Sequence, residues 1–383
     1  MKICMVYDCL YPHTIGGAER WYRQLALHLS QAGHDVTYVT MPQWDHTGPP
    51  ELPGVRVVAV GPRSTLYSNG RRRVAPPLLF GLGVLRHLAT HGSEYDVVQT
   101  VSFPYFPLLA AALLRRGRRY RIVVDWFEVW TREYWDEYLG AFGRVGHWVQ
   151  QRCVRVRQEA FCFSELHERR LRAAGIGGPV TVLRGLYDGE LRPREPLPAD
   201  PLVVFAGRHI PEKQVTAIVP AFTRAREEVP QLRCAIYGDG PEHGEVLRQI
   251  ESYRLEGIAE APGFVAQEQL EQALRNAMCV VLPSRREGYG LIVVEAIARG
   301  TPVVVVRGPD NAAVELVEEG VNGFLAASAS PEHLGEAIVR VHRAGAALRH
   351  STAAWFARNA QVLSLESSLA VLSQRLEERA RGA

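Results

Sequence analysis

Lysine is almost absent from this chain. Only Lys2 and Lys213 occur, and the rest of the 44 basic residues are arginine. Together with abundant alanine, glycine and proline, this bias indicates a GC-rich bacterial genome. Acidic and basic residues nearly balance, with a formal net charge of +3. Bulk charge therefore predicts no nucleic-acid partner.

The sequence also lacks the marks of a disulfide framework and of a membrane span. Six cysteines are present without any C-x-x-C pair, and most lie in apolar runs such as Phe161-Cys162-Phe163. We interpret them as buried free thiols in a reducing cytoplasm. The first apolar run, Ile3 to Tyr7, is too short for a signal peptide. No apolar stretch approaches the ~18–20 residues that span a bilayer, so we expect no integral membrane segment.

Apolar strands alternate with helical segments along the whole chain. A four-proline stretch within residues 192–201 interrupts this alternation, which then restarts. Near-continuous apolar strands joined by helices are typical of parallel sheets covered on both faces. We expect a Rossmann-like domain over residues 1–190, a linker over 191–201 and a second Rossmann-like domain over 202–351. The expected strands lie near 2–8, 36–40, 55–60, 95–101, 121–125, 159–164 and 180–184, and then near 202–206, 233–237, 259–262, 279–282, 303–306 and 323–326.

The most informative segment runs from Glu287 to Glu295 and reads Glu-Gly-Tyr-Gly-Leu-Ile-Val-Val-Glu. Its apolar part predicts a helix that begins near Tyr289. The backbone N–H groups of Tyr289, Gly290 and Leu291 would then be unpaired at the positive end of a helix dipole, where phosphate binds. At ~1.5 Å per helical residue, the two glutamates are too far apart to share a proton. We interpret them as hydroxyl-binding carboxylates, one for a sugar and one for a ribose.

The block from Pro283 to Val304, which contains this segment, resembles the signature of retaining GT-B glycosyltransferases of family 4. The resemblance extends to nearly the whole chain. It implies a GT-B fold, in which two Rossmann-like domains face each other across a cleft and a final helix, about 352–383, packs back on the first domain. It also implies transfer of a sugar from a nucleotide diphosphate donor, most often UDP-linked, by front-face displacement with the donor phosphate accepting the acceptor's proton.

Arg208 and Lys213 follow the first strand of the second domain and resemble the G-R-x-x-x-x-K element of this family. The resemblance implies that both cations hold the donor diphosphate. Fixed cations stabilise the negative charge that develops on a leaving nucleoside diphosphate. We expect Arg208, Lys213 and Glu287 to form the catalytic set. Glu295 would bind the ribose and Glu287 the sugar.

Three further elements are expected to contribute. The resemblance places Gly16-Gly17 in the first β–α turn near the donor, where a Cβ would block the approach of phosphate. It places Phe264-Val265 at a strand end that seats the nucleobase, although Phe264 fits a core position equally well. Phe127 aligns with a histidine that contacts the donor sugar in relatives, so that contact would be missing. Glu128 is a candidate for sugar or acceptor binding, or for a structural role.

No metal or cofactor is predicted. His13, His209 and His243 are isolated in the sequence, and no Asp-x-Asp motif stands at a strand end. Basic clusters at 71–73 and 115–121 suggest either contact with a membrane or acidic acceptor, or solvated faces, which we favour.

We prefer one function among several that the sequence allows. This function is glycosyl transfer to a glycan or to a small-molecule natural product, such as an aminoglycoside antibiotic. A GT-B sugar-nucleotide epimerase, an envelope lipid or polysaccharide glycosyltransferase and a non-catalytic sugar-nucleotide-binding protein are the alternatives. An epimerase would need acid–base groups around the sugar that the sequence does not reveal. The complete set of Arg208, Lys213, Glu287 and Glu295 argues against a non-catalytic protein.

Overall fold

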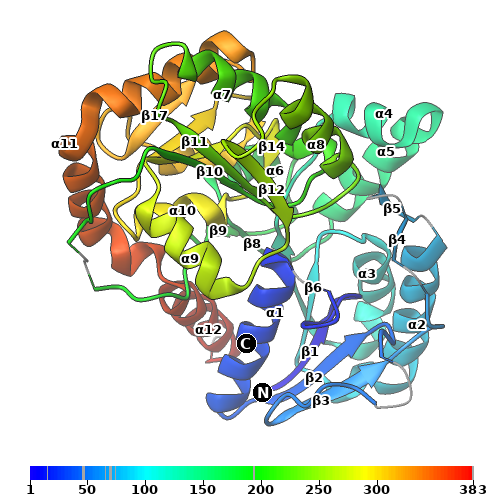
Figure 1. Ribbon diagram of the computed structural model, residues 1–383. Helices are drawn as coiled ribbons and strands as arrows, with labels where there is room; N and C mark the ends of the chain where they lie inside the picture. The colour runs from blue at the N-terminus through cyan, green and yellow to red at the C-terminus, as the bar shows by residue number, and fades with distance from the viewer. Residues whose placement is uncertain are drawn as a thin grey trace. The chain divides into compact units, whose positions relative to one another are not determined.

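The computed structural model describes residues 1–14, 16–44, 48–64, 66–68, 71–73, 75–192 and 195–381. The chain forms two compact units. Unit 1 comprises Met1–Leu183 and Leu369–Ala383, and unit 2 comprises Arg184–Ser368. Figure 1 shows their helices and strands. None of the helices described here combines the length and apolar character required to cross a bilayer.

Unit 1 is built on a seven-stranded sheet in the order β3-β2-β1-β6-β7-β8-β9, and every neighbouring pair is parallel. The central strand β6 (Val97–Val101) is buried at every position, as expected of a sheet covered on both faces. The other strands are β1 (Lys2–Val6), β2 (Asp35–Thr40), β3 (Val55–Ala59), β7 (Arg121–Trp126), β8 (Glu159–Cys162) and β9 (Val180–Val182), with a small hairpin of β4 (Tyr67–Ser68) and β5 (Arg71–Arg72).

The helices of unit 1 cross between these strands. They are α1 (Gly17–Gln31), α2 (Ala75–His91), η1 (Gly92–Glu94), α3 (Phe106–Arg118), α4 (Arg132–Leu139), η2 (Gly140–Phe142), α5 (Gly143–Val154) and α6 (Glu165–Ala173). The C-terminal helix α12 (Leu365–Arg381) also packs on this unit, with Leu372 and Leu376 fully buried. Arg121 donates from Nη2 to the carbonyl of Leu376 at 2.8 Å.

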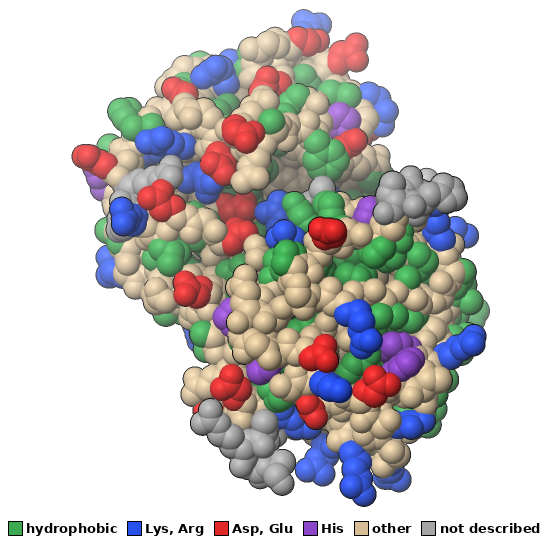
Figure 2. All heavy atoms as spheres, turned by 90° about the horizontal axis from the view of Figure 1, so that it is seen from below, with side chains coloured by type: hydrophobic (Ala, Val, Ile, Leu, Met, Phe, Trp, Pro, Cys, Tyr) green, Lys and Arg blue, Asp and Glu red, His purple; other side chains and the backbone are tan. Residues whose placement is uncertain are grey.

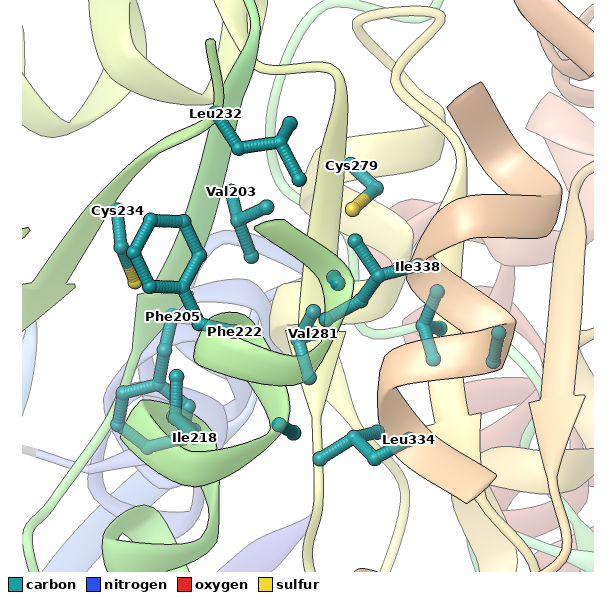
Figure 3. Close-up of a cluster of buried hydrophobic side chains, with 14 of the residues drawn as sticks. Val203, Phe205, Ile218, Phe222, Leu232, Cys234, Cys279, Val281, Leu334 and Ile338 are labelled. Atoms are coloured by element: carbon teal, nitrogen blue, oxygen red, sulfur yellow. The ribbon is translucent and has the colours of Figure 1, made fainter. Parts of the chain in front are cut away.

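Unit 2 contains a six-stranded parallel sheet in the order β12-β11-β10-β13-β15-β17. Its core packs Val203 and Phe205 of one strand against Phe222 and Ile338 of the covering helices (Figure 3). The strands are β10 (Leu202–Ala206), β11 (Arg233–Tyr237), β12 (Ala259–Gly263), β13 (Cys279–Leu282), β15 (Val303–Val306) and β17 (Gly323–Ala326), with the short parallel pair β14 (Arg286–Glu287) and β16 (Asp310–Asn311).

The helices of unit 2 alternate with these strands, as the sequence predicts. They are η3 (Pro211–Lys213), η4 (Val215–Ala217), α7 (Ile218–Arg226), α8 (His243–Ser252), α9 (Gln267–Asn276), α10 (Leu291–Ile297), η5 (Ala312–Leu316) and α11 (Pro331–Leu363). Gly345 adopts a positive φ of 56° inside α11 and divides it into two helical halves.

The unit boundary lies earlier than the linker expected at 191–201. Residues after Leu183 group with unit 2 because Tyr187 is bonded to the end of α11: its N–H donates to the carbonyl of Leu363 at 3.0 Å, and its carbonyl accepts from Leu365 at 2.8 Å. The expected C-terminal helix is also divided, since residues up to 363 belong to α11 and only residues from Leu369 group with unit 1. Residues 193–194 and 382–383 lie outside the described chain.

Candidate active site

The carboxyl ends of β12, β11 and β10 form one continuous edge of the unit 2 sheet. The N–H of Gly207 donates to the carbonyl of Tyr237 at 3.1 Å, and the N–H of Gly238 donates to the carbonyl of Gly263 at 2.8 Å. Gly238 has a φ of 114°, and a Cβ there would collide with the carbonyl oxygen of Gly207. These loops are therefore held in register at the edge where open α/β sheets bind ligands.

An exposed aromatic residue stands at one end of this edge. Phe264 directly follows β12, and 77% of it is exposed. The alternative of a core role for Phe264 is therefore wrong. Val265 beside it is half-buried. A large exposed ring at a strand end provides a flat apolar surface on which a nucleobase can stack, although the seating of a base there remains a prediction.

Arg208 supplies an uncompensated positive charge at the end of β10. Its side chain is exposed and makes no ion pair with any residue that the structure describes. Its backbone carbonyl accepts from the N–H of Ile210, which leads the chain into the turn ending at Lys213. The arginine is thus free to bind an anion at the edge of the sheet.

Lys213 and Glu287 contact each other directly. From the sequence, Lys213 was assigned to the diphosphate of the donor and Glu287 to its sugar. Nζ of Lys213 forms a short ion pair with Oε1 of Glu287. The side chain of Glu287 is 9% exposed and that of Lys213 is 21% exposed, so the pair is largely removed from water. The set of Arg208, Lys213 and Glu287 therefore carries one net positive charge, and Arg208 is its cation without a carboxylate partner in the described part of the chain.

Two residues to which the sequence assigned no role hold Glu287 in place. The hydroxyl of Ser284 donates to Oε1 of Glu287 at 2.7 Å. The amide nitrogen of Asn311 donates to the carbonyls of Ser284 and Val306, each at 2.9 Å, and Asn311 also pairs with Glu287 between β16 and β14. Ser284 lies within the block from Pro283 to Val304 that resembles the family signature, so the sequence could have indicated a role for it. Nothing in the sequence links Asn311 to this carboxylate.

The helix of the signature begins at Leu291, so the predicted start near Tyr289 is wrong by two residues. Gly290 is in the left-handed conformation, with φ 99° and ψ 53°, which a right-handed helix cannot include. A Cβ on Gly290 would lie 2.6 Å from Cβ of Ala313. The orphan amides that could face an anion are therefore the first ones of α10, starting at Leu291, while those of Tyr289 and Gly290 precede the helix.

The side chain of Tyr289 anchors this loop. It is buried, and its hydroxyl donates to the carbonyl of Arg184 at 2.7 Å. Burial raises the pKa of the Tyr289 phenol well above its usual range. Glu295 lies half-buried on α10, about one turn beyond Leu291. The ribose role expected for Glu295 remains a prediction.

His209 and His243, which look isolated in the sequence, contact each other. The turn at Asp239 and Gly240 brings them together, and their Nδ1 atoms lie 3.1 Å apart. Burial of His209, together with the neighbouring His243, lowers the pKa of the His209 imidazole. Within the described ranges, no group of three His, Cys, Asp or Glu side chains is placed to hold a metal ion.

The remaining predicted residues belong to unit 1. Gly16 is the N-cap of α1, and a Cβ there would collide with the carboxylate of Glu19, whereas Gly17 has open space around its Cβ direction. That contact is with the far end of the Glu19 side chain, and the backbone of Gly16 is extended, a conformation that any residue adopts. The proximity of Gly16 and Gly17 to the donor is still a prediction.

Phe127 and Glu128 follow β7. The ring of Phe127 stacks on Phe163, with centroids 4.8 Å apart and an interplanar angle of 4°. Glu128 accepts a hydrogen bond at Oε2 from Nε1 of Trp130 at 2.8 Å. One face of the Phe127 ring is thus used in packing, and Glu128 has a structural partner. Contacts of either residue with a sugar or an acceptor remain predictions.

Two Rossmann-like units, one of which carries cations and a helix start at the carboxyl edge of its sheet, fit the GT-B fold. Residues 15–188 match the family model described as Glycosyltransferase Family 4, and residues 189–354 match Glycosyl transferases group 1. The chain belongs to these family 4, group 1 glycosyltransferases.

Individual relatives agree with this assignment. Glycogen synthase of Mycobacterium tuberculosis is 26% identical over 322 residues, which cover 79% of this chain and 77% of that protein. Sucrose-phosphate synthase from Thermosynechococcus elongatus superposes with a TM-score of 0.81 at 19% identity, over the full length of both chains. Anabaena HepE in complex with UDP and glucose superposes with a TM-score of 0.74 at 20% identity, over 98% of this chain and 99% of that one.

Proposed function

We propose that the protein is a retaining glycosyltransferase that moves a sugar from a UDP-linked donor to a hydroxyl of a small-molecule natural product or a glycan. The observation that carries this proposal is the arrangement of Arg208, the Lys213–Glu287 pair and the start of α10 at one edge of the unit 2 sheet. The binding of UDP by HepE, which shares this fold, supports the choice of nucleotide. The six buried free cysteines are consistent with reaction in a reducing cytoplasm.

In this proposal, positively charged groups of unit 2 stabilise the diphosphate as the leaving group. Cleavage of the bond between the sugar C1 and the phosphate oxygen increases the negative charge on the diphosphate. Arg208, Lys213 and the first amides of α10 stabilise that charge, and Lys213 and the amides are held in place before the reaction by Glu287 and by the helix. The acceptor oxygen bonds to C1 on the face that the diphosphate leaves, and the departing phosphate oxygen takes the acceptor's proton. The configuration at C1 is thereby retained.

Glu287 has the properties of a sugar-binding carboxylate. Its Oε1 is held by Lys213 and Ser284, so the carboxyl group does not need to reorganise when a hydroxyl approaches. A preorganised acceptor in a site with little water distinguishes a substrate with the matching hydroxyl from one without it. Glu295 would bind the ribose in the same manner.

The test begins with thermal-shift measurements of UDP, ADP, GDP and CDP, followed by donor and acceptor screening with detection by mass spectrometry. We expect UDP to give the largest stabilisation and the product to retain the donor's anomeric configuration by NMR. An inverted product would refute retention. Conversion of the donor sugar without any acceptor would favour the epimerase, and binding without turnover would favour the non-catalytic alternative.

A further inference from the structure

The outer face of α2 and α3 in unit 1 exposes large apolar side chains. Leu82 on α2 is 63% exposed and Leu113 on α3 is 71% exposed, and Leu78 and Leu79 on α2 are also exposed. We call these four leucines, with Arg86 and Arg116, the α2–α3 face. Side chains of this size on one face of a protein mark a surface that binds a partner or a membrane.

The two helices pack directly against each other, so their exposed leucines belong to one surface. A Cβ on Gly81 of α2 would collide with Phe106 at the start of α3, which shows how closely the backbones approach. Figure 2 shows hydrophobic side chains lying among both basic and acidic ones on the face of the molecule that it displays.

The charge of this face has a single sign. Neither α2 nor α3 contains an aspartate or a glutamate. Arg86 and Arg116 are exposed and form no ion pair with any residue in the described part of the chain. Elsewhere on the surface, exposed arginines commonly have carboxylate partners, as in the pairs Arg172–Glu168, Arg248–Glu245 and Arg343–Glu228. The α2–α3 face therefore offers uncompensated positive charge beside apolar side chains.

The next crossover helix continues this character. The connections β3 to β6, β6 to β7 and β7 to β8 all advance in the same direction along the sheet. Right-handed crossovers then place α2, α3 and α5 on the same side. Helix α5 also lacks acidic residues, and Trp148 on it is 56% exposed with the Arg152 guanidinium 5.0 Å from its ring centroid.

We propose that the α2–α3 face is a docking surface for an anionic lipid bilayer. The leucines insert among the acyl chains near the headgroups, and the arginines bind lipid phosphates. Trp148 on the neighbouring helix α5 is an exposed tryptophan, a residue type that is enriched at membrane interfaces. Single-stranded nucleic acid fits this face less well, because it is bound by aromatic stacking and phosphate contacts, for which exposed leucines provide nothing. From the sequence alone, we favoured solvated faces over membrane contact for the arginine clusters. The exposed leucines of this face favour membrane contact instead.

The experiment measures co-sedimentation of the full chain with vesicles of phosphatidylcholine alone and of phosphatidylcholine mixed with phosphatidylglycerol. We expect binding to the anionic vesicles only. Leu82→Asp/Leu113→Asp and Arg86→Glu/Arg116→Glu should each weaken it by roughly tenfold or more, because each basic residue near an anionic surface contributes to the affinity. The exposed positions leave folding intact, which a UDP-induced thermal shift equal to that of the unmodified protein verifies.

Matched controls lie in unit 2. Leu247→Asp on α8 changes an exposed leucine, and Arg254→Glu/Arg358→Glu makes the same charge change as the arginine pair. Both should bind vesicles as the unmodified protein does. Absence of binding to anionic vesicles, or equal losses in the face and control variants, would overturn the proposal. Tighter binding to a single-stranded oligonucleotide than to anionic vesicles would assign the face to another polyanion and would also overturn it.

Discussion

The ion pair between Lys213 and Glu287 makes Lys213→Ala the most informative substitution in this protein. We expect kcat to fall by roughly 10²–10³-fold, the usual cost of losing one preorganised group that stabilises transition-state charge. Lys213 would act by its own charge on the diphosphate and by holding Glu287 against the sugar. Both contributions disappear together in the alanine variant.

The same substitution should also lower the free energy of unfolding. The side chain of Glu287 is only 9% exposed, and without Lys213 its known hydrogen-bond donor is the Ser284 hydroxyl. Removing one member of a largely buried pair leaves the other without its counter-charge, and we expect a loss of roughly 1–3 kcal/mol. Lys213→Ala/Glu287→Ala should recover part of this stability, because no unpaired carboxylate remains.

The assay therefore combines steady-state kinetics with chemical unfolding for the two single variants and the double variant. A role for the pair as a unit predicts that the double variant loses little more activity than Lys213→Ala alone. Lys213→Arg keeps the charge and serves as the control for a purely electrostatic effect. A kcat for Lys213→Ala within about threefold of the unmodified enzyme would refute the placement of Lys213 at the diphosphate.

Three further predictions concern the donor. Glu295→Ala should weaken binding of free UDP by roughly 1–3 kcal/mol, whereas Glu287→Ala should chiefly weaken the intact donor; calorimetry showing the opposite pattern would exchange the two roles. Activity should survive EDTA, because Arg208 and Lys213 supply the positive charge; loss on EDTA and recovery with Mg²⁺ would contradict this. The apolar ring of Phe127 predicts a preference for a deoxy or modified sugar, and Phe127→His should shift the kcat/KM ratio towards the fully hydroxylated donor. An unchanged ratio across a donor panel would leave Phe127 with packing alone.

The strands were predictable because this kind of sheet is buried on both faces. β6 and β15 are apolar or buried at each position, so their pattern is visible without any knowledge of their neighbours. The start of α10 was not predictable to the residue. It depends on the left-handed conformation of Gly290 against Ala313, a contact with a distant segment.

In the candidate site, too, residue types could be predicted from the local sequence, whereas contacts between distant segments could not. Arg208, Lys213 and Glu287 were identified by their residue types and spacing. The ion pair between Lys213 and Glu287 joins residues 74 positions apart, and the support from Asn311 depends on the pairing of two very short strands. His209 and His243 likewise meet through a turn whose geometry the spacing alone does not specify. Such contacts arise from tertiary structure and leave no local pattern.

The return of α12 to unit 1 has a consequence for biosynthesis. The first 183 residues leave the ribosome long before Leu372 and Leu376, which are buried in the unit that those residues form. The hydrogen-bond partners of His28 in α1 and Arg121 in β7 are Ser373 and Leu376, which are also synthesised later. All residues of unit 2, by contrast, have been synthesised before α12 is complete. The nascent chain therefore holds unit 1 without these two buried leucines until translation reaches α12.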